Sequence, residues 1–165
     1  MAIALECLLL VCTLVYSTLA AGPGQWSRTI QFPLVPAAGA VEPASGQLIV
    51  WSAYRTDTFA INAENVTQTA VYNPKDGSVK LFPVAYTEHD MFCPGVSFDF
   101  SGNLLVTGGD TSAATSLFSQ GAWTWSKKAQ MQRARGYQSS TTLSDGRIFT
   151  IGGSWSGARG GSKLT

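Results

Sequence analysis

A glycine turn, a short apolar run and a pair of glycines recur along this chain at a fixed spacing. One copy covers residues 99–110 (DFSGNLLVTGGD), and the next covers residues 143–154 (LSDGRIFTIGGS). The turn glycines Gly102 and Gly146 lie 44 residues apart, and the two glycine pairs keep the same spacing. This repeat constrains the fold strongly, because each copy must form the same supersecondary unit.

A weaker copy covers residues 42–52 (EPASGQLIVWS), where Trp51-Ser52 stand in the place of the glycine pair. A period in the forties with a glycine turn, a β-rich run and Gly-Gly is typical of a kelch blade, one four-stranded sheet of a β-propeller. No sustained helical periodicity follows residue 21. We therefore predict an all-β chain, a kelch-type β-propeller of about three blades. The alternative is a β-sandwich with chance glycine pairs.

Two segments between the repeats predict the outer strands of these blades. Residues 69–81 have the form strand, Asn-Pro-Lys-Asp-Gly turn, strand, and residues 116–125 repeat that plan. We interpret both as scaffold without a function of their own. About three blades make an open arc that exposes the apolar face of its last blade. We therefore expect the polypeptide alone to be poorly stable or prone to aggregation.

The first 21 residues predict a secretory signal peptide. An apolar run at 8–16 is followed by the small residues 17–21, so cleavage is expected after Ala20 or Ala21. The run is short for a membrane span, and Gly-Pro-Gly follows it directly. We divide the chain into a signal peptide, 1–21, and a partial propeller domain, 22–165. The expected product is secreted and extracellular, with no membrane partner after cleavage.

The charge pattern excludes some partners. The formal net charge is +1 at pH 7, and the charged residues are scattered along the chain. We therefore expect no nucleic-acid or anionic-membrane partner. In a secreted chain, Asn65-Val66-Thr67 is a sequon that predicts N-glycosylation at Asn65.

Two segments carry residues that a blade does not need. Residues 89–95 (HDMFCPG) contain Cys93, the one cysteine left after signal cleavage, and residues 134–140 (ARGYQSS) contain Tyr137. Cys93 and Tyr137 lie 44 residues apart, which predicts equivalent places on neighbouring blades. From the residues alone, Cys93 is a buried thiol or the partner of an intermolecular disulfide, and Tyr137 is a core tyrosine.

Over nearly the whole mature chain, residues 25–157, the sequence resembles galactose oxidase and the related fungal copper radical oxidases. The resemblance rests on 30–38 (IQFPLVPAA), 51–55 (WSAYR), 89–95 and 134–140. It implies a seven-bladed propeller, of which this chain is an N-terminal fragment. It also implies oxidation of a primary alcohol, in a sugar or a small alcohol, to an aldehyde, with reduction of oxygen to hydrogen peroxide.

The same resemblance implies the site residues. Cys93 and Tyr137 are expected to form a thioether cross-link and a radical cofactor, with Tyr137 binding copper as a phenolate. Trp155 is expected to stack over the cross-link, and Phe59 and Phe92 to line the substrate pocket. Each of these three aromatic residues is otherwise a packing residue.

The remaining copper ligands of the family, a second tyrosine and two histidines, lie in segments that follow the part resembled here. The chain has a single histidine, His89, whose position is not a ligand in the family. One imidazole cannot replace two, so we expect the chain alone to be inactive, and whether it is an enzyme stays open. A full-length form is expected to be a monomer. The alternative function is a non-catalytic kelch-type module that binds a protein or glycan through its loops.

Overall fold

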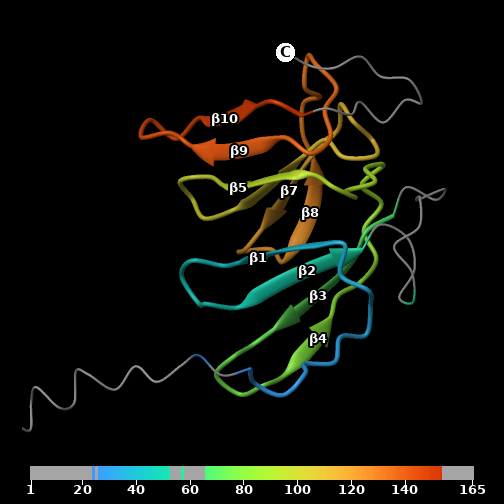
Figure 1. Cartoon of the computed structure of the whole chain (residues 1–165), viewed down its shortest axis with the longest axis vertical. Helices are drawn as coiled ribbons and strands as arrows, with labels where there is room; N and C mark the ends of the chain where they lie inside the picture. The colour runs from blue at the N-terminus through green and yellow to red at the C-terminus, as the bar shows by residue number, and fades with distance from the viewer. Residues whose placement is uncertain (1–23, 25, 53–56, 58–65, 154–165) are drawn as a thin grey trace, which may run out of the picture. The chain divides into compact units, whose positions relative to one another are not determined.

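The computed structural model describes residues 24, 26–52, 57 and 66–153 (Figure 1). The chain divides into two compact units, Met1–Gln31 and Phe32–Thr165. The described residues of the first unit, 24 and 26–31, form no strand. The described part of the second unit carries all the strands discussed below. Within the described residues no helix is long and apolar enough to cross a membrane.

The described residues form two four-stranded sheets and one two-stranded sheet, all antiparallel, with the strands of each sheet paired in chain order. The first sheet contains β1 (Ala38–Val41), β2 (Leu48–Ser52), β3 (Gln68–Tyr72) and β4 (Val79–Leu81). The second contains β5 (Gly95–Phe98), β6 (Leu104–Thr107), β7 (Thr115–Ser119) and β8 (Thr124–Lys127). The third contains β9 (Ser139–Thr142) and β10 (Ile148–Ile151). The all-β prediction is confirmed, and both predicted outer hairpins are present as β3–β4 and β7–β8.

Each copy of the repeat forms the turn and the second strand of one sheet. Strands β2, β6 and β10 each begin two residues after a turn glycine with positive φ, namely Gly46 (73°), Gly102 (78°) and Gly146 (84°). In every copy a carboxylate also accepts hydrogen bonds from backbone amides of the turn. These carboxylates belong to Glu42, Asp99 and Asp145. The carboxylates stand at different distances from the turn glycine, so the glycine and the apolar run after it are what make the repeat visible in the sequence.

The weaker first copy aligns one residue differently from our prediction. Counted from the turn glycine, Ser52 rather than Trp51 occupies the place of Gly108. The prediction was wrong, because Trp51 corresponds to Thr107, the last residue of β6, and β2 continues one residue further to Ser52. Trp51 lies within the strand, where it pairs with Ala38 and Thr69.

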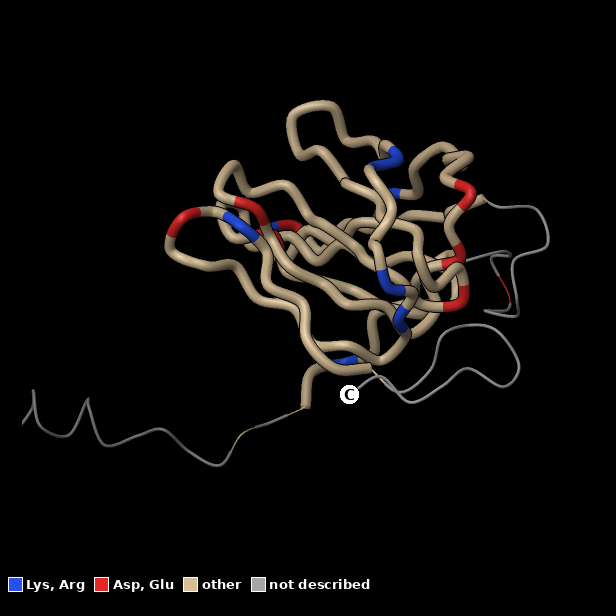
Figure 2. The backbone as a smooth tube through the Cα atoms, turned by 90° about the horizontal axis from the view of Figure 1, so that it is seen from above, with Lys and Arg blue, Asp and Glu red and all other residues tan. Residues whose placement is uncertain are grey.

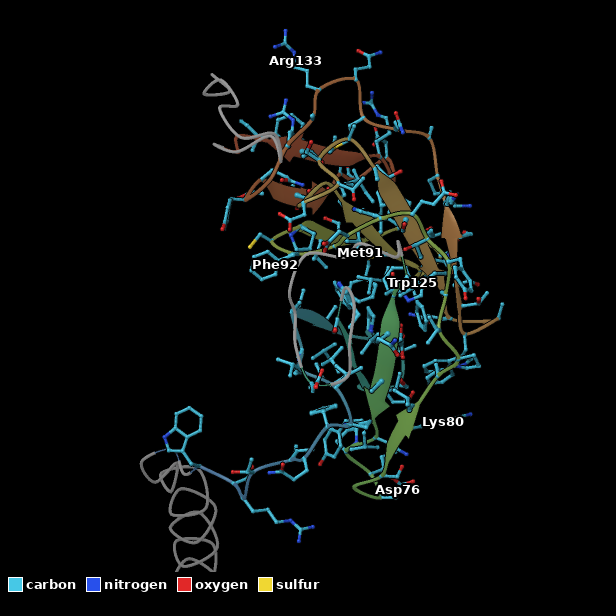
Figure 3. The ribbon with its side chains drawn as sticks, turned by 90° about the vertical axis from the view of Figure 1, so that its right-hand side faces the viewer. Asp76, Lys80, Met91, Phe92, Trp125 and Arg133 are labelled. Carbon is cyan, nitrogen blue, oxygen red and sulfur yellow. The ribbon has the colours of Figure 1, made fainter. Side chains whose placement is uncertain are left out.

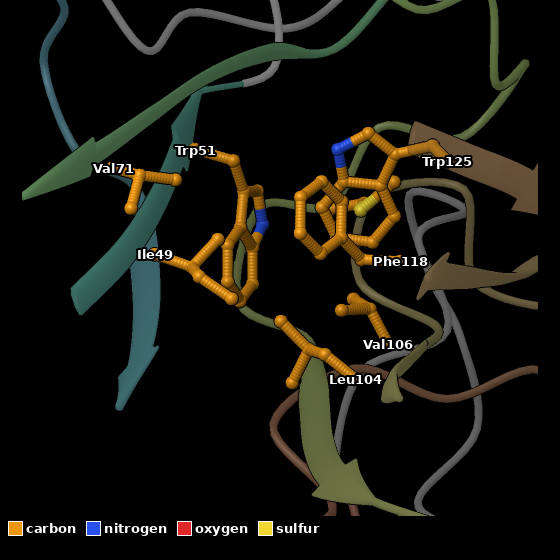
Figure 4. Close-up of a cluster of buried hydrophobic side chains, with 8 residues drawn as sticks. Ile49, Trp51, Val71, Leu104, Val106, Phe118 and Trp125 are labelled. Carbon is orange, nitrogen blue, oxygen red and sulfur yellow. The ribbon is translucent and has the colours of Figure 1, made fainter. Parts of the chain in front are cut away.

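Side chains of the first two sheets pack together in the main hydrophobic core (Figure 4). The rings of Trp51 and Trp125 meet edge to face with centroids 5.6 Å apart, and Phe118 lies 5.1 Å from Trp125. The indole N–H of Trp125 donates to Thr69 Oγ1 at 2.8 Å, which satisfies a polar atom in an apolar setting. The other buried members are Ile49, Val71, Met91, Leu104 and Val106. This core holds the first two sheets side by side, as expected of successive blades.

The third sheet packs against the second, with β9 in contact with β5 (Figure 1). Polar groups make this contact: Thr142 Oγ1 donates to the carbonyl of Phe98, and Gln138 Nε2 donates to the carbonyl of Thr107 at 2.5 Å. Gly95 leaves room for the approach, because a Cβ there would lie within 2.8 Å of side-chain oxygens. The loops that lead into β5 and β9 are therefore held next to each other.

The glycine pair after β6 is the place where these two loops meet. Gly108 and Gly109 have φ of +59° and +105°. A Cβ on Gly108 would overlap the carbonyl oxygen of Arg135, and one on Gly109 would lie 2.5 Å from the carbonyl oxygen of Phe92. The Gly109 N–H also donates to the Arg135 carbonyl at 2.9 Å. Both loops thus pack directly on backbone that has no side chain.

His89 holds the backbone of Gly108 in place through a buried hydrogen bond. Its ring is fully buried, with Nε2 donating to the Gly108 carbonyl at 2.8 Å and Nδ1 accepting from the Ser116 hydroxyl at 3.0 Å. A carbonyl only accepts, so the neutral ring carries its proton on Nε2. Burial lowers the pKa of His89 from 6.5 to about 4, against the opposing effect of the bond to Gly108. His89 is a structural clamp, and both its nitrogens are engaged.

A glycine series tests the close approach at Gly108. Gly108→Ala adds both a strained φ and a backbone clash, and should lower the free energy of unfolding by roughly 2–4 kcal/mol. Gly46→Ala has the strained φ with open space around it, and should cost about 1–2 kcal/mol. Gly121→Ala has neither feature and should stay within about 0.5 kcal/mol of the unmodified protein. Urea unfolding measures all three, and equal losses at Gly108 and Gly46 would contradict the packing described.

A pH series tests the clamp at His89. The unfolded imidazole takes up a proton near pH 6.5, whereas the folded one does so only near pH 4. Acid therefore favours the unfolded chain: the stabilisation is complete above pH 6.5, declines through this window, and is lost below about pH 4. The full decline should be about 3 kcal/mol.

His89→Gln supplies the control, because glutamine can still donate to Gly108 but does not titrate. Carboxylates contribute equally to both proteins, so the difference between the two pH profiles isolates His89. The chain has one histidine, so a single imidazole resonance reports its titration by NMR. A midpoint near 6.5 in the folded protein would refute the buried clamp.

Candidate functional site

Cys93 and Tyr137 occupy equivalent places, as their spacing predicted. Each lies two residues ahead of the first strand of its sheet, Cys93 before β5 and Tyr137 before β9. Both have left-handed backbone, with φ of 58° and 57°. The Tyr137 N–H donates to the Cys93 carbonyl at 3.0 Å, so the two loops are joined at these residues.

The two side chains also meet. A hydrogen bond between the Cys93 side chain and the Tyr137 hydroxyl is the largest cause that raises the pKa of Tyr137 above its ordinary 10.0. The electrostatic influence of Cys93, burial and the charge of Asp110 act in the same direction. In this arrangement the phenol is protonated and lies in contact with a sulfur atom.

Exposure argues against a fully buried role for either residue. Tyr137 is 61% exposed, so the interpretation as a core tyrosine is wrong. Cys93 is half-buried and has no disulfide partner within the described residues, so it is not a fully buried apolar filler. A phenol and a thiol in contact at the surface of two loops are accessible to oxygen and to a metal ion.

Asp110 acts electrostatically on Tyr137, and Asp90 acts on Asp110; neither residue was singled out from the sequence. Asp110 follows the glycine pair directly, and its pKa is raised by burial and by the negative charge of Asp90. Asp90 is almost fully buried; its carbonyl accepts from the Thr111 N–H at 3.2 Å, and its N–H donates to Thr111 Oγ1 at 2.8 Å. The signal for Asp110 was its place after Gly-Gly, where the repeat keeps a polar residue.

Gln138 anchors the strand that begins beside Tyr137. Its side chain is buried, and Nε2 donates to both the carbonyl and the hydroxyl of Thr107, at 2.5 and 3.2 Å. These bonds cross from the third sheet to the second. They fix the position of the adjacent Tyr137 backbone relative to β6.

Of the other predicted site residues, the structure describes only Phe92. Phe92 is half-buried beside Cys93, and its backbone N–H donates to Asp90 Oδ1 at 3.2 Å. Figure 3 shows Phe92 on the side of the sheets away from Lys80 and Trp125. Phe59, Trp155 and the sequon residue Asn65 lie outside the described residues.

The described residues fit part of a copper site. Tyr137 offers an exposed phenol as a ligand, whereas His89 is buried with both nitrogens engaged. No group of three or more His, Cys, Asp or Glu side chains within the described ranges could hold a metal ion. A copper ion at Tyr137 would therefore need further ligands from other residues.

Charge does not single out another face of the described chain. Figure 2 shows acidic and basic residues scattered along it, interspersed by sign. The ion pairs that the structure contains, such as Lys127 with Glu88 at 2.6 Å, lie at exposed positions. The loops around Cys93 and Tyr137 thus remain the best-supported candidate site.

Known proteins were compared with this chain. No protein-family model matches it. Two curated galactose oxidases of Gibberella zeae are each 51% identical to it over 136 residues. The matched region is 82% of this chain and 20% of each relative, so the chain spans about a fifth of the length of the curated relatives it matches.

A solved structure gives the same assignment. It is described as a novel fungal alcohol oxidase with catalytic diversity among the AA5 family, in complex with copper. It superposes with a TM-score of 0.71 at 40% identity, covering 84% of this chain and 29% of that chain. The sheets described above therefore have the arrangement of a partial β-propeller of this type. Sequence and fold agree that the chain belongs to the galactose oxidase family.

Proposed function

We propose that this chain supplies the radical cofactor of a secreted copper oxidase, a thioether formed between Cys93 and Tyr137. The observation that carries the proposal is their shared geometry. Two side chains that can form the bond stand at equivalent left-handed positions, with backbone and side chains both in contact. The family relationship supports the same pairing.

The backbone conformation gives this observation weight. A residue other than glycine costs about 1–2 kcal/mol in the left-handed region. The chain uses glycine freely where turns need positive φ, yet it has cysteine and tyrosine at these two places. Such outliers are typical of functional sites, where the fold holds a particular side chain in spite of its conformational cost.

The chemistry follows from the contact of sulfur with phenol. A thioether substituent lowers the oxidation potential of the ring, so Tyr137 could hold an unpaired electron as well as bind copper as a phenolate. Copper together with that radical supplies the two-electron acceptor needed to oxidise an alcohol to an aldehyde. Asp110 also acts electrostatically on the Tyr137 phenol, and a carboxylate there suits a cationic metal.

The remaining parts of the proposal rest on the family. The substrate would be a primary alcohol, in a sugar or a small molecule, and oxygen would be reduced to hydrogen peroxide. Trp155 would stack on the cross-link, Phe59 and Phe92 would line the pocket, and Asn65 would carry a glycan. Secretion after cleavage of residues 1–21 and a monomeric state belong to the same proposal.

Peptide mapping tests the cross-link directly. The complete open reading frame that contains this chain is expressed, loaded with copper in air, and digested with trypsin. Peptides 81–127 and 136–147, which contain Cys93 and Tyr137, should then run as one species. Its mass should be lower than the sum of the two by the mass of two hydrogen atoms.

Substitutions provide the controls for this test. Cys93→Ser and Tyr137→Phe should both abolish the joined species and lower alcohol oxidation at least about a hundredfold. Tyr86→Phe alters another exposed tyrosine and should change neither readout. Separate peptides in the copper-loaded protein, or full oxidase activity in Cys93→Ser, would refute the proposal. Specific ligand binding without oxidation would instead favour the non-catalytic module.

A further inference from the structure

The outer strands of the first two sheets enclose a groove that neither the core nor the candidate site accounts for. It consists of two hollows, of about 270 and 560 Å³, which share the side chains of Lys80, Phe82 and Trp123 as a wall. It lies on the β4 side of the sheets, and Lys80 and Phe92 are well separated in Figure 3. The groove is therefore distinct from the site around Cys93.

The shared wall is aromatic and rigid. Phe82 and Trp123 stack with centroids 5.4 Å apart and planes 12° from parallel, and Phe118 supports Trp123 edge-on at 5.8 Å. Lys80 Nζ lies 4.8 Å from the centre of the Phe82 ring. Trp123 has φ of 50°, a conformation rarely adopted by a large side chain. As at Cys93 and Tyr137, the fold holds a bulky residue where glycine would be easier.

The smaller hollow also contains a polar atom without a partner. Gln47 Oε1 is buried, lines this hollow, and accepts no hydrogen bond from the described residues. An unmet acceptor of this kind costs free energy unless a ligand or water donates to it. The other polar side chains that line this hollow are already engaged: Asn73 Nδ2 donates to Asp76, Asn73 Oδ1 accepts from the Lys75 N–H, and the Ser78 side chain bonds to Asp76. Gln47 Oε1 can thus accept from a ligand, and the Lys80 ammonium, which lies over the Phe82 ring, can still donate to one.

We propose that this groove binds a neutral carbohydrate, with one pyranose ring in each hollow. A pyranose has an apolar C–H face that packs on aromatic rings, and hydroxyls at its edge that can donate to Gln47 Oε1 and accept from Lys80 Nζ. No acidic side chain lines either hollow, and Lys80 is the one charged residue among the lining residues. Two hollows across one aromatic wall favour an oligosaccharide over a single sugar. The proposal does not depend on the oxidase function.

Isothermal titration calorimetry with defined sugars tests the groove. The probes are glucose, cellobiose and cellotetraose, and the matching β-1,4-linked galactose series, titrated into the whole chain. We expect a Kd on the order of 1 mM for the better tetrasaccharide, and affinity that increases with length. Gln47→Leu should weaken binding about tenfold by removing the acceptor. Lys80→Ser should weaken it severalfold.

Matched controls make the result decisive. Gln132→Leu and Tyr86→Ala alter exposed residues outside both hollows and should leave the Kd unchanged. Trp123→Ala should abolish binding, but Trp123 also packs on Phe118, so Gln47→Leu and Lys80→Ser carry the test if that variant unfolds. The proposal is overturned if no probe binds at millimolar concentration, or if Gln47→Leu binds as well as the unmodified chain. Binding of a proline-rich peptide without any sugar would equally overturn it.

Discussion

The backbone at Gly108 is the constraint on which the candidate site depends. Its carbonyl accepts a hydrogen bond from Nε2–H of buried His89, its N–H donates to the Ala114 carbonyl, and its missing side chain admits the carbonyl of Arg135. Gly108 therefore helps to position both the loop before β5 and the loop before β9. The contact between Cys93 and Tyr137 follows from this, because each lies at the end of one of those loops.

The two contacts between sheets differ in their physical character. The first is an apolar core of Trp51, Phe118 and Trp125, in which area removed from water supplies the stabilisation. The second relies on hydrogen bonds, as in Gln138 with Thr107, between strands that approach closely at Gly95. Hydrogen bonds are directional, whereas apolar contacts tolerate sliding. The directional contact occurs beside Tyr137, where position matters for chemistry.

Much of the fold was predictable because the repeated glycines mark turns that need positive φ. Turn glycines and the apolar runs that follow them are local sequence patterns, and they predicted the second strand of every sheet. The register of the first copy was mispredicted although the sequence contains it, since Gly108 and Gly152 each lie six residues after the turn glycine, and the same count from Gly46 leads to Ser52. The pairing of Cys93 with Tyr137 followed from spacing and family resemblance together. Asp110, Gln138 and the orphaned acceptor of Gln47 depend on contacts between sheets, which a single sequence does not encode locally.

The residues that carry the two proposals share a left-handed backbone conformation, which packing alone does not require. Cys93, Tyr137 and Trp123 all have positive φ, and each presents a reactive or aromatic side chain beside a strand. Glu88 is the other such residue within the described ranges besides glycine, and it makes an exposed ion pair with Lys127. A repeated scaffold evolves by reusing its turns, so a costly side chain at a position open to glycine indicates selection for that side chain. On this argument one propeller segment combines two independent surfaces: a loop pair suited to radical chemistry, and a rim groove suited to a sugar.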